Sequence, residues 1–349
     1  MVFPSDGLPS PTSAQALQVA TAGEALMDLI EGSDGLLRPC RGGAVYNLTR
    51  ALGLQGVRTL YLNPLSGDSM GRQLAQGLHE AGVTLATPQP VRKPTSLAVA
   101  ALDAQGKARY SFYREGVADR QVSAPSLTQA CSSVPGLQIV ATGCLALVAQ
   151  DAGIYLPWLQ EQRAAGRMVV VDANLRLSAV DDATAYRTNV MAALQQAHLI
   201  KVSDDDLEDL AVPGSDALAR AHHLLQATSA QWLALTLGAG GAWLLQRDGQ
   251  ALHAVEASPV VVADTVGAGD CFLAGLITAL LATPTQDQAP VQPNAHGLAA
   301  LLPAPRMREV LRHALASASL CVEQAGCVPP TYAAARTRAD AVRWASASD

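Results

Sequence analysis

The chain has 349 residues, of which 49% are hydrophobic and 15% charged, and its formal net charge is −6. This length and apolar content suit one large α/β domain with an embellishment, or two domains. The acidic balance, without any long basic run, argues against nucleic acid or an anionic membrane as the main partner. The longest apolar run, residues 271–282, is shorter than the roughly 20 residues that span a bilayer. The first basic residue is Arg38, so the N-terminus lacks the charged start of a signal peptide, and we expect a soluble, cytoplasmic protein.

Six cysteines are spread along the sequence without a C-x-x-C pair or a His-rich segment. Such spacing argues against a structural zinc site and against a disulfide framework. We expect buried free thiols instead. The cysteines are Cys40, Cys131, Cys144, Cys271, Cys321 and Cys327.

The N-terminal part of the chain begins with a Pro/Ser-rich segment, residues 1–16, which we expect to be disordered. From Gln18 the pattern predicts two strands, or one strand with a bulge at Gly23, ending in the acidic residues Asp28 and Glu31. A buried strand rarely carries an unpaired carboxylate. Asp28 therefore either lines a polar site, which we favour, or points to solvent.

Two glycines, Gly42 and Gly43, precede an amphipathic helix that should begin near Ala44. Glycines permit a ligand to approach the backbone closely. Asn47, one turn into the helix, could reach the same place. The simpler alternative is an ordinary loop followed by a helix.

Residues 96–116 contain two apolar stretches joined by a short polar turn at residues 103–106. This pattern predicts a β-hairpin rather than a crossover unit. Strand alternation puts Tyr110, Phe112 and Arg114 on one face of its second strand. An aromatic and cationic face suggests a lid over a polar ligand, and the alternative is a solvated edge with a basic face. Because an exposed hairpin invites pairing with a second copy, we expect a homodimer.

From Gln138 onward strands and helices alternate regularly, and continuous apolar runs such as residues 168–171 predict strands buried on both faces. This pattern predicts an α/β fold with a mostly parallel sheet between two layers of helices. Ligand-binding residues of such sheets gather at the carboxyl ends of the strands. The polar and glycine residues at those ends are Asp172, Asn174, Arg176, Lys201, Ser203, Thr236 and the glycine-rich run from Gly238 to Gly241.

The most informative stretch is Val260 to Ala282, which predicts a strand over residues 260–262, a turn through Gly267, Ala268 and Gly269, and then a helix. The N–H groups at a helix start and the helix dipole favour a phosphate or an oxyanion. Asp270, in the first turn, could cap the helix or take a proton from a substrate hydroxyl. The alternative is an ordinary capped helix after a buried strand. Residues 283–305 follow as a Pro/Gln/Ala-rich loop insertion.

Two of these segments, GG-x-x-x-N at residues 42–47 and DTVGAGD at residues 264–270, occur in the order of the two signatures of the ribokinase-like (PfkB) family of sugar kinases. The resemblance covers nearly the whole chain, from about Val19 to Thr331. GEALMDLI at 23–30, FYREGVADR at 112–120 and DANLR at 172–176 look most like bacterial fructokinases. The 2-keto-3-deoxygluconate kinases share several of these segments and are the alternative.

The resemblance implies one kinase domain over residues 17–340 with a ribokinase-like fold and a small β lid. It implies ATP-dependent transfer of a phosphoryl group to a hydroxyl of a monosaccharide. Fructose is the first expectation, 2-keto-3-deoxygluconate the second, and another sugar or a nucleoside the third. It also implies Mg²⁺, with K⁺ as a further candidate ion.

The same resemblance assigns roles to individual residues. Asp270 would deprotonate the sugar, and the N–H groups of Gly267, Ala268 and Gly269 would form the anion hole. Asp206 stands where many relatives carry a glutamate that helps to place Mg²⁺, although its side chain is one methylene shorter. The sugar would be held by Asp28, Gly42, Gly43, Asn47, Phe112, Arg114 and Arg176. The nucleotide would be held by Asn174, Lys201, Ser203, Thr236, Gly238, Gly240, Asp264 and Thr265.

Two features favour a neutral ketose over a sugar acid. Asp28 would repel an anionic substrate, and Phe112 offers no hydroxyl to a carboxylate. Arg176 could bind either a phosphate or a carboxylate, which keeps the sugar acid open.

Overall fold

The computed structural model describes residues 17–32, 34–102, 108–282, 302–341 and 343–345. The expected N-terminal tail, residues 1–16, and most of the expected insertion at 283–305 lie outside this part of the chain. Among the residues described, no helix has both the length and the apolar character needed to cross a bilayer.

A ten-stranded sheet forms the centre of the molecule, in the order β14-β13-β12-β11-β10-β9-β8-β1-β4-β5. The strands from β11 to β5 run parallel, which confirms the predicted sheet, and β12, β13 and β14 extend it with antiparallel pairs. Every residue of β9 is buried, as expected for a parallel strand covered on both faces. The bounds are β1 Val19–Thr21, β4 Thr59–Tyr61, β5 Thr84–Leu85, β8 Ile139–Gly143, β9 Met168–Asp172, β10 Leu199–Ser203, β11 Trp232–Thr236, β12 Ala242–Gln246, β13 Ala251–Glu256 and β14 Trp344–Ala345.

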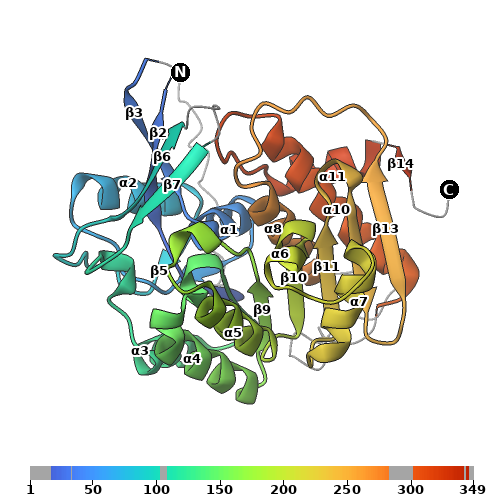
Figure 1. Ribbon diagram of the computed structural model, residues 1–349, viewed down its shortest axis with the longest axis horizontal. Coiled ribbons are helices and arrows are strands. Elements are labelled where there is room, and N and C mark those ends of the chain that lie inside the picture. Colours follow the sequence, from blue (N-terminus) through green and yellow to red (C-terminus); the bar gives the residue numbers. More distant parts are fainter. Residues whose placement is uncertain (1–16, 33, 103–107, 283–301, 342, 346–349) are drawn as a thin grey trace, which may run out of the picture.

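Helices cover both faces of this sheet (Figure 1). One face packs against α3 (Ala124–Ser132), α4 (Ala152–Ala164), α5 (Ala183–Leu194) and α7 (Ala217–Ala227), which bury Leu127, Trp158, Tyr186 and Leu224. The other packs against α1 (Ala44–Leu54), α8 (Ala268–Leu281) and α10 (Ala304–Val322), which bury Leu48, Phe272 and Leu311. Among the residues described, the remaining helices are α2 (Ser69–Glu80), α6 (Asp204–Asp209), α11 (Tyr332–Ala341) and the short 3-10 turns η1 Ala118–Arg120, η2 Cys144–Leu147, η3 Ala149–Asp151, η4 Leu177–Ala179 and η5 Gly238–Gly240.

A second sheet of four strands, β3-β2-β6-β7, projects from one side of the molecule (Figure 1). Its strands are β2 (Leu26–Glu31), β3 (Leu37–Gly42), β6 (Ser96–Leu102) and β7 (Ala108–Tyr113). The expected lid hairpin, β6 and β7, is therefore half of a larger sheet, because β2 pairs with β6 in parallel. The sequence did not predict β3. Its residues, LRPCRG, are mostly exposed and include a proline, which within sheets is confined to edge strands, so the pattern does not indicate a strand.

Two expected elements differ from the structure. Residues 260–262 form no strand, and Val261 and Val262 are 77% and 59% exposed. The run of β-branched residues instead belongs to an extended segment between β13 and α8. The segment from Ala333, for which no helix was predicted, lies in α11, which packs on α10.

Candidate active site

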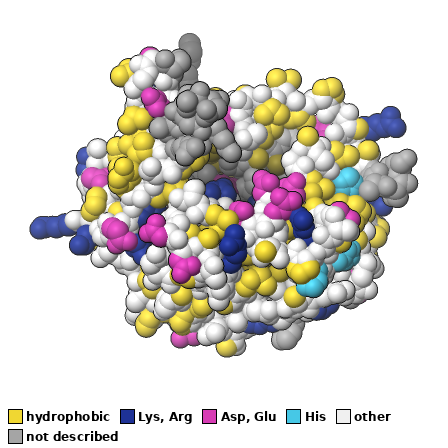
Figure 2. Space-filling view, in the orientation of Figure 1, with side chains coloured by type: hydrophobic (Ala, Val, Ile, Leu, Met, Phe, Trp, Pro, Cys, Tyr) yellow, Lys and Arg dark blue, Asp and Glu magenta, His cyan; other side chains and the backbone are white. Residues whose placement is uncertain are grey.

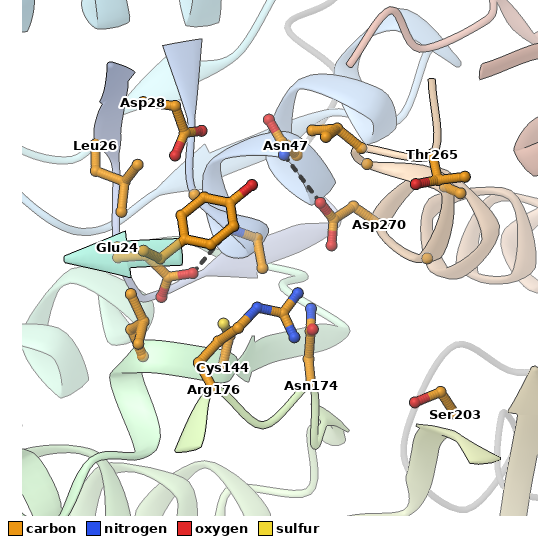
Figure 3. Close-up of a pocket in the computed structure, with 18 of the residues that line it drawn as sticks. Glu24, Leu26, Asp28, Asn47, Cys144, Asn174, Arg176, Ser203, Thr265 and Asp270 are labelled. Atoms are coloured by element: carbon orange, nitrogen blue, oxygen red, sulfur yellow. Dashed lines mark hydrogen bonds between the residues drawn. The ribbon is translucent and has the colours of Figure 1, made fainter. Parts of the chain in front are cut away.

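A cavity of about 480 Å³ opens where the carboxyl ends of β8 to β11 face the small sheet. Figure 2 shows a hollow on this face beside a group of acidic side chains, and Figure 3 shows the side chains that line it. Most of the predicted site residues, which are scattered over the whole sequence, meet here. They are Asp28, Gly43, Asn47, Phe112, Asn174, Arg176, Lys201, Ser203, Thr236, Thr265, Gly267, Ala268, Gly269 and Asp270.

The turn before α8 forms one wall of the cavity. Gly267 is the N-cap and adopts a left-handed conformation with φ of 79°, where a side chain would also collide with the sulfur of Cys327. The helix starts at Ala268, so the N–H groups of its first turn have no partner within the helix. A Cβ at Gly269 would lie 2.9 Å from Nζ of Lys201. The turn therefore presents backbone donors beside a lysine ammonium, which is the chemistry of an anion site.

Asp270 follows directly and points into the cavity with only 6% of its surface exposed. Its Oδ2 accepts a hydrogen bond of 2.9 Å from Nδ2 of Asn47, which joins α1 to α8 (Figure 3). Burial raises the pKa of Asp270 to about 6, although Asn47, Lys201 and Arg176 act in the opposite direction. The carboxylate is thus charged at neutral pH and close to the pKa that suits a general base.

Lys201 is held by Asp172, with 3.1 Å between Nζ and Oδ1 and both side chains buried. Burial lowers the pKa of Lys201, but the Asp172, Asp206 and Asp270 carboxylates outweigh it and keep the pKa above its ordinary value. Burial also raises the pKa of Asp172 to about 7, against the effect of Lys201. The anion-binding turn therefore has a permanent positive charge next to it.

Asp28 and Arg176 line the cavity from two further sides (Figure 3). The Asp28 carboxylate packs against Gly42 of β3, where any side chain would collide with it. Burial raises the pKa of Asp28 to about 6, and Arg176 counteracts this. Arg176 projects into the cavity from the η4 side (Figure 3). A substrate between these walls would meet an acceptor on one side and a cationic donor on the other.

Glu24 was missed by the sequence analysis, although it lines the same cavity. Its Oε1 accepts hydrogen bonds from the backbone N–H groups of Ala44 and Val45, at 2.8 and 3.3 Å, and so fixes the start of α1. Its Oε2 has no partner within the described part of the chain, and burial raises its pKa to about 7. The reasoning used for Asp28 applies to Glu24 as well: a carboxylate within an apolar stretch is rarely left unpaired, and its position indicates a polar site.

Arg114 was expected to cover the sugar, but it does not line the cavity. Its guanidinium donates to the carbonyl oxygen of Leu145 at 2.9 Å and forms an ion pair of 3.4 Å with Asp119. Strand alternation had placed Arg114 on the same face as Phe112. Because β7 ends at Tyr113, that alternation does not extend to Arg114. Tyr110, on the same face as Phe112, lines the cavity instead and stacks with it at 6.1 Å between ring centroids.

Two predicted aspartates hold the backbone rather than face the cavity. Asp264 accepts from the N–H groups of Val266 and Gly326 at 3.0 and 2.9 Å. Asp206 accepts from those of Leu175 and Ser203, both at 2.8 Å. Because both oxygens of Asp206 are used in this way, the structure does not favour it as a direct metal ligand. The neighbouring Asp205 lines the cavity.

A second cavity, of about 430 Å³, adjoins the first and shares Thr236, Thr265, Ala268 and Gly269 with it. Gly238 lines this cavity, whereas Gly240 lies outside both and accepts a hydrogen bond of 2.9 Å from the ring of His253 if its Nε2 carries the proton. The walls are largely apolar and include Val260, Val262, Phe272, Leu315, Ala318 and Val322. Two of the valines before α8, Val260 and Val262, thus line this cavity.

Comparison with known proteins identifies the family. The family described as pfkB family carbohydrate kinase matches residues 17–333. A fructokinase of Rhizobium leguminosarum bv. trifolii is 30% identical over 267 residues, which cover 75% of this chain and 79% of the relative. The chain belongs to the pfkB family, and its members' activity makes it a carbohydrate kinase, an enzyme that phosphorylates a sugar.

Solved structures show the same fold. A fructokinase of Xylella fastidiosa with bound ATP superposes with a TM-score of 0.78 at 24% identity, covering 93% of this chain and 99% of that one. A fructokinase double mutant of Vibrio cholerae O395, bound to fructose, ADP and a potassium ion, gives 0.73 at 20% identity, with 93% and 99% covered. These likenesses confirm the expected mostly parallel sheet between helices.

Proposed function

We propose that the protein transfers the γ-phosphoryl group of ATP to a hydroxyl group of fructose. The observation that carries this proposal is the buried Asp270 carboxylate, held by Asn47 at the start of α8 beside Lys201. A phosphoryl transfer needs a base for the acceptor hydroxyl and fixed positive charge for the phosphate oxygens. Both lie within one cavity here.

In the proposed reaction the sugar binds between Asp28, Asn47 and Arg176. Asp270 takes the proton of the sugar hydroxyl while the hydroxyl oxygen forms a bond to the γ-phosphorus of ATP. The bond between that phosphorus and the bridging oxygen breaks, and ADP leaves. Lys201 and the N–H groups of the first turn of α8 stabilise the charge on the transferred group. The second cavity would hold the adenosine portion of ATP.

The balance of charge favours a neutral sugar. Glu24, Asp28 and Asp270 line the sugar end of the cavity, whereas Arg176 is the cation directed into it from η4. A carboxylate substrate would be repelled by the acidic groups around it. Relatives named fructokinase support the same choice. The 2-keto-3-deoxygluconate alternative rests on Arg176, which could pair with a carboxylate.

The ions and the assembly form part of the proposal. Mg²⁺ prefers carboxylates together with phosphate oxygens, and Asp205, at the edge of the cavity, would hold its water shell. When bound, the ion would neutralise charge on the phosphates. K⁺ remains a second expected ion, supported by the potassium-bound relative from Vibrio cholerae O395. An enzyme that consumes ATP is expected in the cytoplasm.

A homodimer through the small sheet is proposed as well. That sheet and the turn before β3 carry exposed apolar side chains, with Leu36, Leu37 and Tyr113 at 63%, 49% and 59% exposure. Exposed strands with apolar side chains favour pairing with a second copy. Light scattering coupled to gel filtration should report twice the chain mass, and a monomer at working concentration would contradict the dimer.

The substrate is tested with purified protein, ATP and Mg²⁺ against fructose, other neutral hexoses and 2-keto-3-deoxygluconate, with ADP release as the readout. We expect the highest kcat/KM for fructose. If the protein consumed ATP with the keto-deoxy acid and ignored fructose, the alternative would replace this proposal.

A further inference from the structure

Three of the cysteines that looked unrelated in the sequence lie together in the structure. The sulfur atoms of Cys271, Cys321 and Cys327 are all within 4.8 Å of one another. They are free thiols, as expected, but α8, α10 and the following loop bring them together at one point, which their spacing in the sequence did not indicate. Cys271 and Cys321 are fully buried and Cys327 is half-buried.

We propose that Cys271, Cys321 and Cys327 form a three-thiolate binding site for a thiophilic d¹⁰ metal ion of the Zn²⁺ and Cd²⁺ class. Thiolates select such ions over Mg²⁺ and Ca²⁺, which prefer oxygen. The site is separate from the proposed sugar and nucleotide cavities, and its test does not depend on which sugar is phosphorylated.

The distances fit a metal with small adjustments. Tetrahedral zinc binds sulfur at about 2.3 Å, which places neighbouring sulfur atoms about 3.8 Å apart. Sulfur atoms within 4.8 Å of one another need to move by about 1 Å or less to reach that geometry. A fourth position is left for water, or for the carbonyl oxygen of Val266, which lies 3.6 Å from the Cys321 sulfur.

The scaffold around the cluster is held in place from several directions. The N–H group of Gly326 donates to Asp264 at 2.9 Å, which fixes the loop that carries Cys327. Nη1 of Arg50 donates to the carbonyl oxygen of Cys327 at 3.4 Å. Cys271 belongs to the first turns of α8, where the helix dipole favours negative charge. A site arranged before binding costs less entropy to fill.

An ion could reach the cluster from outside. Cys327 lines a surface cavity of about 480 Å³ together with Arg41, Arg50, Glu80 and Cys40. This cavity is distinct from the one that contains Asp270. Cys40 is exposed there and is not part of the cluster, so it serves as a control for accidental binding to a surface thiol.

The test uses the full chain, reduced with a phosphine and freed of metal under an inert atmosphere. Cd²⁺ is titrated in, and the thiolate-to-cadmium charge-transfer absorption is recorded with the stoichiometry from equilibrium dialysis. We expect one tightly bound Cd²⁺ per chain with the absorption of three thiolates, and weaker binding of Zn²⁺ that competes for the same site. Alkylation followed by peptide mass spectrometry should show Cys271, Cys321 and Cys327 protected by the metal.

Variants separate this site from the other thiols. Cys321→Ala should weaken Cd²⁺ binding at least about tenfold. Cys131→Ala, which removes a thiol equally buried but distant in α3, and Cys40→Ala should leave the affinity unchanged. The alkylation result on the unaltered protein decides the matter if Cys321→Ala does not fold. Absence of a charge-transfer band, loss of binding in Cys40→Ala, or a disulfide among the three thiols with no metal uptake would each overturn the proposal.

Discussion

The two cavities that meet at the turn before α8 are lined by different kinds of side chain. The first is lined by several ionisable side chains, including Glu24, Asp28, Asp270, Arg176 and Lys201. The second is lined mainly by aliphatic side chains and glycines, with Glu256 as its one ionisable side chain among the residues described. Both have similar volumes, of about 480 and 430 Å³.

From this difference in lining we expect the two cavities to have different roles. In the proposed reaction the polar cavity binds, orients and deprotonates a hydroxyl group, which suits ionisable groups whose pKa values are shifted by burial. In the same proposal the apolar cavity accepts the flat ring of the nucleotide base, for which shape and backbone conformation are sufficient. Changes in the first cavity should therefore affect the chemical step, and changes in the second should affect nucleotide affinity.

The largest effect is expected from Asp270→Asn. The amide keeps the shape of the side chain and can still accept from Asn47, but it cannot take a proton. We expect kcat to fall by at least about 10² while the melting temperature and the Kd values for sugar and ATP stay close to wild type. Asp216→Asn, at the N-cap of α7 and outside both cavities, is the matched control. It should leave kcat, the melting temperature and both Kd values close to wild type. Wild-type turnover in Asp270→Asn would remove the carboxylate from the mechanism.

The next effect comes from Gly269→Ala. A methyl group there would press on the Lys201 ammonium, 2.9 Å away, and displace the charge that faces the phosphate. We expect kcat to fall by at least about tenfold without loss of stability, because alanine favours a helix over glycine by up to about 1 kcal/mol. Gly153→Ala in α4, with no atom within 4 Å of the new methyl, should leave the rate unchanged. Full activity in Gly269→Ala would argue against the anion site.

Gly267→Ala should behave differently. Its φ of 79° and its contact with Cys327 leave no room for a side chain. Both the melting temperature and the rate are expected to fall. Measuring the two properties together therefore distinguishes a strained turn from a perturbed anion site. Gly267→Ala with an unchanged melting temperature would contradict the strain.

The pH dependence provides a smaller effect. In the proposed mechanism Asp270 acts as a carboxylate, and its pKa is raised to about 6, so protonation below that value would remove the base. We expect kcat/KM for the sugar to be constant above the pKa and to be about tenfold lower at pH 5. Asp28→Asn should keep this acid limb. If the limb vanished in Asp28→Asn, it would belong to sugar binding rather than to proton transfer.

The sequence was sufficient to predict elements whose signals are local. The predicted alternation of strands and helices from Gln138 onward is present as β8 to β11 and the helices between them, because buried strands and amphipathic helices carry their own periodicity. The glycine turn before α8 was also predicted from its residues. The strand predicted before it is absent from the structure, since Val260 and Val262 line the second cavity and Val261 is exposed, so none of the three belongs to a sheet.

What the sequence could not supply was proximity between distant segments. Asn47 and Asp270 are 223 positions apart and yet share a hydrogen bond. The clustering of Cys271 with Cys321 and Cys327 and the departure of Arg114 from the cavity depend equally on how helices and loops pack. Such contacts have no periodic signature, so only a resemblance to a known family could anticipate some of them.

Within the polar cavity, Asp28 and Arg176 test the choice of substrate. Asp28→Ala should raise KM for fructose about tenfold, because a charged acceptor of hydroxyl hydrogen bonds is lost. Arg176→Ala should raise it less, since a neutral sugar offers no carboxylate for a bidentate contact. Steady-state kinetics with fructose as the varied substrate measures both. A larger increase for Arg176→Ala would favour the sugar acid.

The smallest effect is expected in the apolar cavity. Ala318 lies half-buried in α10 on its wall, and Ala318→Leu would fill part of the space without adding charge. We expect KM for ATP to rise several-fold, roughly the 1 kcal/mol of a modest steric conflict, while kcat at saturating ATP and KM for fructose stay unchanged. Ala304→Leu, exposed at the start of the same helix, controls for the added side chain. An equal rise in the KM for fructose would mean that the two cavities do not act separately, because the packing change would then have reached the residues around Asp270.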